Sequence, residues 1–151
     1  MARLSPDRYL CLDVGERRIG VAAGSSDTGL ARPIEVITRT GDDGVLARRL
    51  REVVKRESTG TVVIGDPLNM DGSSGEGCER SRRFAKWLKS AMRQVRVVLY
   101  DERLSSFTAD EWMERDGLKR ARRKEMRDAY AAAAILQEYW SAEREEQDAD
   151  A

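Results

Sequence analysis

Histidine is absent from the 151 residues, and cysteine, proline and phenylalanine are scarce. Without histidine the chain cannot form a Ser-His-Asp triad, a Cys-His dyad or an HExxH zinc site. The two cysteines, Cys11 and Cys78, lie far apart in apolar segments, which is typical of buried thiols in a reducing compartment. Catalysis would therefore rest on carboxylates, a metal, Lys, Arg, Ser, Thr, Tyr or Cys.

Long apolar runs are also missing, since no stretch approaches the ~18 residues of a membrane span. The start of the chain lacks the apolar core of a signal peptide. With 40% hydrophobic and 36% charged residues, the composition indicates a soluble globular chain that can bury its own core. We predict a single domain over residues 1–142, a disordered acidic tail over 143–151, a cytoplasmic location and no membrane partner.

The net charge of zero conceals an uneven distribution of charge. The last 14 residues hold six acids against one arginine, so the rest of the chain is net basic. The steepest basic stretch, residues 115–127, has seven Lys or Arg against two acids and includes Arg122, Arg123 and Lys124. Such a stretch either binds the phosphates of a nucleic acid or forms a solvated helix face, and charge alone does not decide between them.

The apolar pattern predicts an α/β fold. Strands are expected over residues 8–14, 19–26, 33–39, 61–65 and 96–100, and helices over 42–57, up to about 93, from 105 or 106, and over 122–142. Short turns join the first three strands and helices separate the later ones, which predicts a five-stranded mixed sheet flanked by helices. In the first strand, alternation places Asp13 on the face of Cys11 and opposite Leu12.

Three acids stand where an ionised carboxylate is unfavourable. Asp13 lies in an apolar strand, Glu102 follows the fifth strand, and Asp128 shares with Ile135 a helix face that should turn toward the sheet. Burial makes such groups costly to ionise unless they share a divalent cation. Oxygen ligands without His or Cys favour Mg²⁺ or Mn²⁺, and the matching chemistry is attack of water on a phosphodiester.

Each acid also has a structural interpretation. Asp13 could end its strand in a turn, and Glu102 could join a local salt bridge. Asp128 could pair with one of the basic residues that precede it: Arg122, Arg123, Lys124 or Arg127. The loop over residues 69–77 could form Asx turns or offer backbone amides to a phosphate. Four aromatic residues at helix positions are predicted to belong to the core rather than to stack on bases: Trp87, Trp112, Tyr130 and Trp140.

The chain resembles the YqgF/RuvX family in four ordered segments, LCLDVGERRIGVAAG, IGDPLNMDGSSG, DERLSSFTA and RDAYAAAAILQEY, which span about residues 8–140. Members are described as Holliday junction resolvases and pre-16S ribosomal RNA nucleases. The resemblance implies a ribonuclease-H-like fold. It also implies that Asp13, Glu102 and Asp128 are catalytic residues that bind the metal, Mg²⁺ or Mn²⁺.

The same resemblance implies a set of nucleic-acid contacts: Arg17, Arg18, Asn69, Gly72, Arg103, Ser105 and Ser106. Two positions depart from the family pattern. The strand before the loop usually ends Gly-Leu-Pro but here carries Asp66 in place of Leu, and Ser106 replaces the usual Thr. Asp66 could be a fourth ligand of the acidic cluster or an exposed charge at the loop.

Four hypotheses of function follow. The leading one is a metal-dependent nuclease that acts on RNA at the 5′ end of pre-16S rRNA. The second is a Holliday junction resolvase, which would act on branched DNA as a homodimer because paired cuts need two active sites. The third is an ATP-binding phosphotransferase, because DVGERRIG resembles the phosphate loop of actin-like ATPases, although those proteins use two such domains. The fourth is a non-catalytic nucleic-acid-binding module.

Overall fold

The computed structural model describes residues 3–67, 75–102 and 106–150. The strands are β1 (Ser5–Val14), β2 (Arg18–Ser25), β3 (Leu30–Thr38), β4 (Thr59–Pro67) and β5 (Arg96–Glu102). The helices are α1 (Asp43–Glu57), α2 (Glu76–Ala91), α3 (Ser106–Arg115) and α4 (Arg120–Ala149). The predicted α/β architecture is confirmed, and no helix in these ranges is both long and apolar enough to cross a bilayer.

The five strands form one mixed sheet in the order β3-β2-β1-β4-β5. β1 pairs antiparallel with β2 and parallel with β4, and β4 pairs parallel with β5. α1 and α2 are the crossovers that such parallel pairs require. The carboxyl ends of β1, β4 and β5 therefore meet at one edge of the sheet, where the turn from β1 into β2 also lies.

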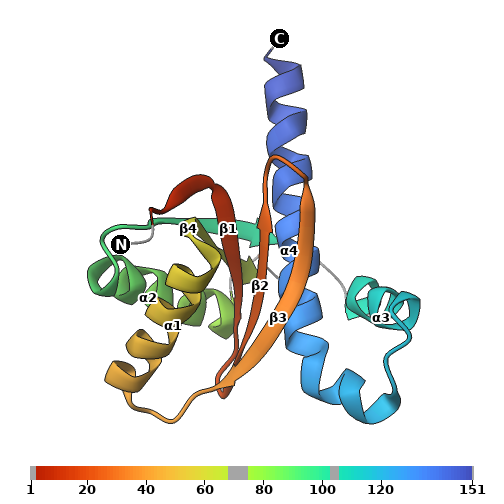
Figure 1. Cartoon of the computed structure of the whole chain (residues 1–151), viewed down its shortest axis with the longest axis horizontal. Helices are drawn as coiled ribbons and strands as arrows, with labels where there is room; N and C mark the ends of the chain where they lie inside the picture. Colours follow the sequence, from red (N-terminus) through yellow and green to blue (C-terminus); the bar gives the residue numbers. More distant parts are fainter. Residues whose placement is uncertain (1–2, 68–74, 103–105, 151) are drawn as a thin grey trace.

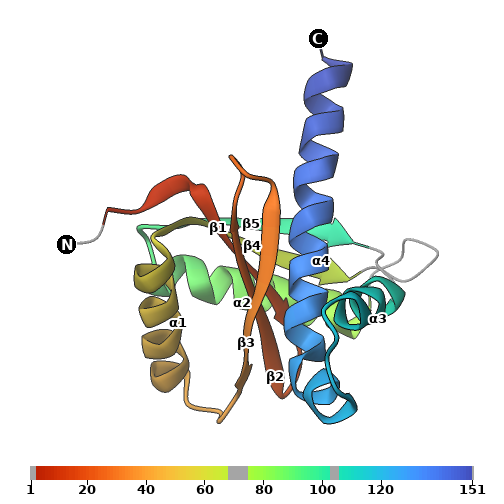
Figure 2. The same ribbon diagram turned by 45° about the vertical axis from the view of Figure 1, so that its right-hand side comes forward.

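Helices cover both faces of the sheet (Figures 1 and 2). On one face, Leu10 and Leu12 of β1 pack in a core with side chains of α1 and α2. On the other face, Cys11 packs with Ala132 and Leu136 of α4. α3 packs against α4 rather than on the sheet. The predicted alternation of β1 is thus confirmed, and it directs Asp13 toward α4.

Two helix boundaries are informative: the start of α1, which a side-chain cap explains, and the end of α4, which differs from the prediction. α1 begins after Asp42, whose carboxylate accepts hydrogen bonds from the backbone N–H groups of Gly44 at 2.9 Å and Val45 at 3.1 Å. α4 projects past the sheet and ends at Ala149 (Figure 1). The predicted end of the last helix at residue 142 is therefore wrong, because residues 143–149 are helical. A disordered tail over residues 143–151 stays a prediction. A single domain over residues 1–142 stays a prediction.

The four aromatic residues divide into two groups. Tyr130 and Trp140 are buried, as predicted, and Trp140 meets the ring of Tyr9 edge-on with the ring centroids 5.5 Å apart. Trp87 and Trp112 are only partly buried. The prediction of a core role is therefore incomplete for these two indoles, which keep part of their surface open to solvent.

Candidate active site at the sheet edge

Asp13 lies between two glycine positions in neighbouring strands. Gly20 of β2 is its register partner, and because Leu12 pairs with Ile64, the next residue of β4 on that side is Gly65. Residues opposite one another in a sheet share a face. The absence of side chains at both glycines therefore leaves room beside the carboxylate of Asp13 on the face that α4 covers.

Gly20 lets the backbone of α4 approach the sheet closely. A Cβ atom placed on Gly20 would stand 1.9 Å from the carbonyl oxygen of Asp128 and 2.9 Å from the backbone nitrogen of Ala129. No side chain fits at such distances, so only glycine permits this contact. The contact places Asp128 over the strand next to the one that carries Asp13.

Gly65 makes similar room for Glu102. A Cβ atom on Gly65 would lie 3.6 Å from Cγ of Glu102 and 3.0 Å from Cδ1 of Ile135 in α4. Glu102 ends β5 and is 9% exposed. Its side chain thus lies over Gly65 on the same face of the sheet as Asp13.

The three carboxylates influence one another electrostatically. Burial, followed by the negative charges of Asp128 and Glu102, raises the pKa of Asp13 to about 7. Burial also raises the pKa of the Cys11 thiol, and the charges of Asp13 and Glu102 add to that rise. Because such interactions weaken with distance, the structure brings these three acids together from remote parts of the chain.

Asp128 forms an ion pair with Arg18 of β2. Nε of Arg18, the first residue of β2, lies 3.2 Å from Oδ2 of Asp128, and the two side chains are 59% and 32% exposed. An ion pair this exposed contributes less than about 1 kcal/mol. Arg18 is thus beside the acids, and Asp128 pairs with an arginine from β2 rather than with one preceding it on its own helix.

The oxygen atoms of these three acids are ligands that suit a hard divalent cation, although in the structure they lie too far apart to hold one together. All are carboxylate oxygens, and the pKa of Asp13 is raised first by burial and then by the neighbouring negative charges, both of which a bound cation would offset. Within residues 3–67, 75–102 and 106–150, no three His, Cys, Asp or Glu side chains gather closely enough to hold a metal ion. Metal binding would therefore require these side chains to draw together, with Asp128 released from Arg18.

The basic residues predicted near the start of the last helix occupy the first turns of α4. Nη1 of Arg122 lies 3.0 Å from Oε2 of Glu125, and Nε of Arg123 donates to the carbonyl oxygen of Leu118 at 2.7 Å. Lys124 is exposed. Asp128 follows Lys124 by about 6 Å along the helix axis. The basic turns therefore lie immediately beside the acidic group.

The remaining predicted contacts lie partly outside the described residues. Asn69, Gly72, Arg103 and Ser105 all fall there, and of Ser106 only the backbone, at the first position of α3, is described. Arg17 is exposed on the turn from β1 to β2, and its carbonyl oxygen accepts a hydrogen bond from the backbone of Arg39 at 2.8 Å.

Asp66 fits neither of its two predicted roles. It is 2% exposed, and its Oδ2 lies 3.2 Å from Nε of Arg82 on α2. Since Gly65 faces α4, the alternation of β4 turns Asp66 to the opposite face of the sheet. Asp66 is therefore a buried, ion-paired residue on the α2 side. It is neither a fourth member of the acidic group nor an exposed charge.

Sequence reasoning missed the two glycines that build the site. A glycine inside a strand often marks the close approach of another backbone, and both Gly20 and Gly65 lie within strands. This signal was present in the sequence. It did not reveal which segment would approach, because Asp128 of α4 is more than a hundred residues away from Gly20 along the chain.

Residues 7–142 match the model of a family described as "RuvX: Holliday junction resolvase". A relative from Chloroflexus aurantiacus, named "Putative pre-16S rRNA nuclease", is 41% identical over 135 residues, which cover 89% of this chain and 87% of the relative. A relative of the same name from Geobacillus sp. (strain WCH70) is 38% identical over 133 residues, which cover 87% of this chain and 96% of the relative.

Solved structures of RuvC from Thermus thermophilus share the fold. RuvC in complex with a Holliday junction substrate matches with a TM-score of 0.58 and 19% identity, over 89% of this chain and 94% of that one. A second RuvC structure matches with a TM-score of 0.54 and 17% identity, over 91% and 96%. This likeness shows a ribonuclease-H-like fold, as predicted. With the family match and the close relatives, we conclude that the chain belongs to the RuvX (YqgF) family.

Proposed function

We propose that the chain is a divalent-metal-dependent nuclease that hydrolyses RNA, with the 5′ end of pre-16S rRNA as its substrate. The observation that carries the proposal is the placement of Asp13, Glu102 and Asp128 at one edge of the sheet, near enough for the charges of the other two to contribute to the raised pKa of Asp13. The name shared by the relatives from Chloroflexus and Geobacillus supports the choice of substrate. A cytoplasmic location goes with this substrate.

The three acids would hold Mg²⁺ or Mn²⁺, which in a carboxylate site generates hydroxide from water and stabilises the leaving oxygen. In this proposal Arg18 also binds the substrate. Its guanidinium group pairs with Asp128 in the structure and has the geometry to bind a phosphate oxygen instead. Arg18 would then exchange a carboxylate for the substrate phosphate when the site fills.

The start of α4 supports backbone binding beside the acids. Its first turn holds no acid, and no side chain caps it, although a helix N-terminus favours negative charge. Lys124 adds an exposed positive charge to the same turns, and Arg122 is also exposed there although it pairs with Glu125. Phosphates of a bound strand would neutralise this charge.

A Holliday junction resolvase is the second candidate, and the description of the matching family model favours it. The likeness to RuvC adds only a shared fold. This activity would require a homodimer that presents two acidic sites to one four-way junction.

A substrate panel tests the proposal. The purified chain is mixed with single-stranded RNA, structured pre-16S RNA, single-stranded DNA and a four-way DNA junction, each with and without Mn²⁺. We expect Mn²⁺-dependent cleavage of the two RNA substrates. Cleavage of the four-way junction alone would favour the resolvase, and cleavage of none of the four substrates would reject both nuclease assignments.

A further inference from the structure

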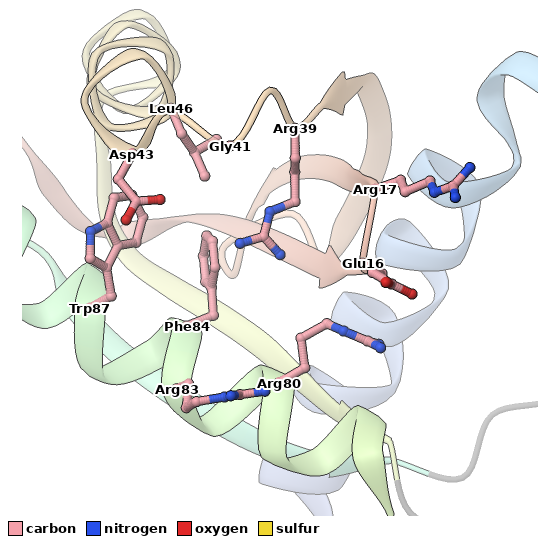
Figure 3. Close-up of a pocket in the computed structure, with 10 residues that line it drawn as sticks. All are labelled: Glu16, Arg17, Arg39, Gly41, Asp43, Leu46, Arg80, Arg83, Phe84 and Trp87. Carbon is pink, nitrogen blue, oxygen red and sulfur yellow. The ribbon is translucent and has the colours of Figure 1, made fainter.

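A second concave site lies on the opposite face of the sheet from α4 (Figure 3). It is a cavity of about 460 Å³ between the β1–β2 turn, the β3–α1 connection and α2. We call it the arginine pocket and define it by Arg39, Arg80, Arg83, Phe84 and Trp87. Because Phe84 belongs to the core under α1 and α2, the pocket opens on that side of the molecule.

Three guanidinium groups give the pocket its positive charge. Arg39 donates from Nη1 to the carbonyl oxygen of Gly15 at 3.0 Å, and its Cζ lies 5.6 Å from the centroid of the Phe84 ring. Arg80 and Arg83, one turn apart on α2, form no salt bridge with any carboxylate in the described part of the chain. Among the described residues, therefore, no salt bridge neutralises the charge of Arg80 or Arg83.

Two carboxylates also line the cavity but do not neutralise it. Glu16 and Asp43 are exposed, and neither forms a salt bridge within the described ranges. In Figure 3, Arg80 extends toward Glu16, and Arg17 points away from the other arginines. Even without Arg17, the three arginines outnumber these two carboxylates, so the lining of the pocket keeps a net positive charge.

An aromatic surface accompanies this charge. Trp87 is partly exposed and packs on Phe84, with the ring centroids 5.2 Å apart and the rings tilted by 54°. Guanidinium groups bind phosphates, and the exposed part of an indole offers a surface on which a base stacks. This combination is typical of sites that bind single-stranded nucleic acid.

The pocket and the acidic site both adjoin the β1–β2 turn. Asp13 and Glu16 are three residues apart, so their Cα atoms are separated by at most about 11 Å. The hydrogen bond from Arg39 to Gly15 ties the pocket to this same turn. We propose that the arginine pocket binds single-stranded RNA a few nucleotides from the cleaved bond, as the strand passes around the end of the sheet. This inference rests on the proposed nuclease function.

The test measures binding in the Asp13→Asn background, where cleavage does not interfere. Fluorescence anisotropy of a labelled single-stranded RNA is compared for the parent, for Arg80→Ala with Arg83→Ala, and for Arg48→Ala with Lys89→Ala. The last pair removes the same charge from exposed positions on α1 and α2 outside the pocket. We expect the pocket pair to bind at least about tenfold more weakly than the control pair, and the slope of log affinity against log salt to flatten by roughly 1.4. Equal affinities of the two pairs would overturn the inference.

Trp87→Leu separates RNA from a polyanion without bases. Loss of a stacked base should weaken RNA binding about tenfold and leave binding of inorganic polyphosphate unchanged. Equal losses for the two polymers would overturn the assignment to RNA. Circular dichroism checks that each variant is folded. Cleavage by the unaltered chain is measured separately, so a failure of the nuclease proposal would show there and not in these affinities.

Discussion

Asp13 sits in an environment that opposes its negative charge. Burial and two neighbouring carboxylates raise its pKa to about 7. Carboxylates kept together in this way are costly to the fold, and proteins accept such a cost mainly at functional sites. At the scale of the residue, the acidic group therefore lowers the free energy of unfolding, and this effect can be measured.

Asp13→Asn should stabilise the metal-free chain at alkaline pH. The folded chain holds the Asp13 proton up to about pH 7, and the unfolded chain loses it from the ordinary value of 3.8, so unfolding releases a proton between these values. The free energy of unfolding therefore falls as pH rises through this window and stays low above it. We expect Asp13→Asn to raise it by about 1 to 3 kcal/mol at pH 8, and by less at pH 5, in urea unfolding. A variant less stable than the parent at pH 8 would contradict the account.

Gly20→Ala should displace α4. The added Cβ would collide with the backbone of Asp128, which cannot move aside as a flexible side chain can. We expect a loss of about 2 to 4 kcal/mol in the free energy of unfolding. The control is Gly44→Ala, where the nearest atom is the carboxylate oxygen of Asp42 at 3.2 Å and the change should stay within about 1 kcal/mol. Similar losses for the two variants would count against the close contact.

Among the elements, α3 is held to the molecule through α4. The hydroxyl of Tyr130 donates to Oδ2 of Asp116 at 2.7 Å, and Nη1 of Arg127 lies 2.9 Å from Oδ1 of Asp110. Tyr130 also packs with Ala109 and Met113 in a small buried cluster. The start of α4, where the predicted basic contacts lie, is thus joined to α3 by both polar and apolar contacts.

Tyr130→Phe should weaken this joint in a pH-dependent way. The hydrogen bond from Tyr130, followed by the one from Arg115, lowers the pKa of Asp116. Stability that comes from a lowered pKa is present above the ordinary pKa of an aspartate and is lost as pH falls through the folded value. Tyr130→Phe should therefore lower the thermal midpoint at pH 7 and differ less from the parent in acid. A difference that grows as the pH falls would show that Asp116 is not the partner.

Most elements could be predicted because their apolar residues repeat with a clear period. β1 and α1 are examples, with predicted bounds within three residues of the structure. The end of α4 could not be predicted in this way, since residues 143–149 have no apolar face. They continue the helix because they are mostly good helix formers and include no Gly or Pro.

The acidic site could be predicted in outline for a topological reason. The sequence predicts that each acid stands where an ionised carboxylate is unfavourable and that Asp128 faces the sheet. The parallel pairing of β1, β4 and β5 then brings the carboxyl ends that carry Asp13 and Glu102 to one edge. The pairing of Asp66 with Arg82 and of Asp128 with Arg18 could not be predicted, because each depends on which face a strand residue takes and on how a helix is rotated. The arginine pocket likewise joins segments with no shared sequence pattern.

For the molecule as a whole, binding of the proposed cation should offset the destabilisation that the acidic group causes. Mn²⁺ at about a hundredfold excess over its dissociation constant would add about 2.7 kcal/mol to the free energy of unfolding. We expect the thermal midpoint of the unaltered chain to rise by several degrees, and that of Asp13→Asn to rise much less. Asp101→Asn, which changes an exposed acid next to Glu102, is the matched control and should respond like the unaltered chain. Equal shifts in all three proteins would place the bound metal elsewhere.

The most direct measurement of the central claim is Mn²⁺-dependent cleavage of single-stranded RNA by three proteins prepared in parallel: the unaltered chain, Asp13→Asn and Asp101→Asn. The account predicts that Asp13→Asn falls to the background seen without Mn²⁺, while Asp101→Asn cleaves at the rate of the unaltered chain. Cleavage by Asp13→Asn at an undiminished rate would contradict it, because the reaction would then not depend on the three acids that the fold brings together.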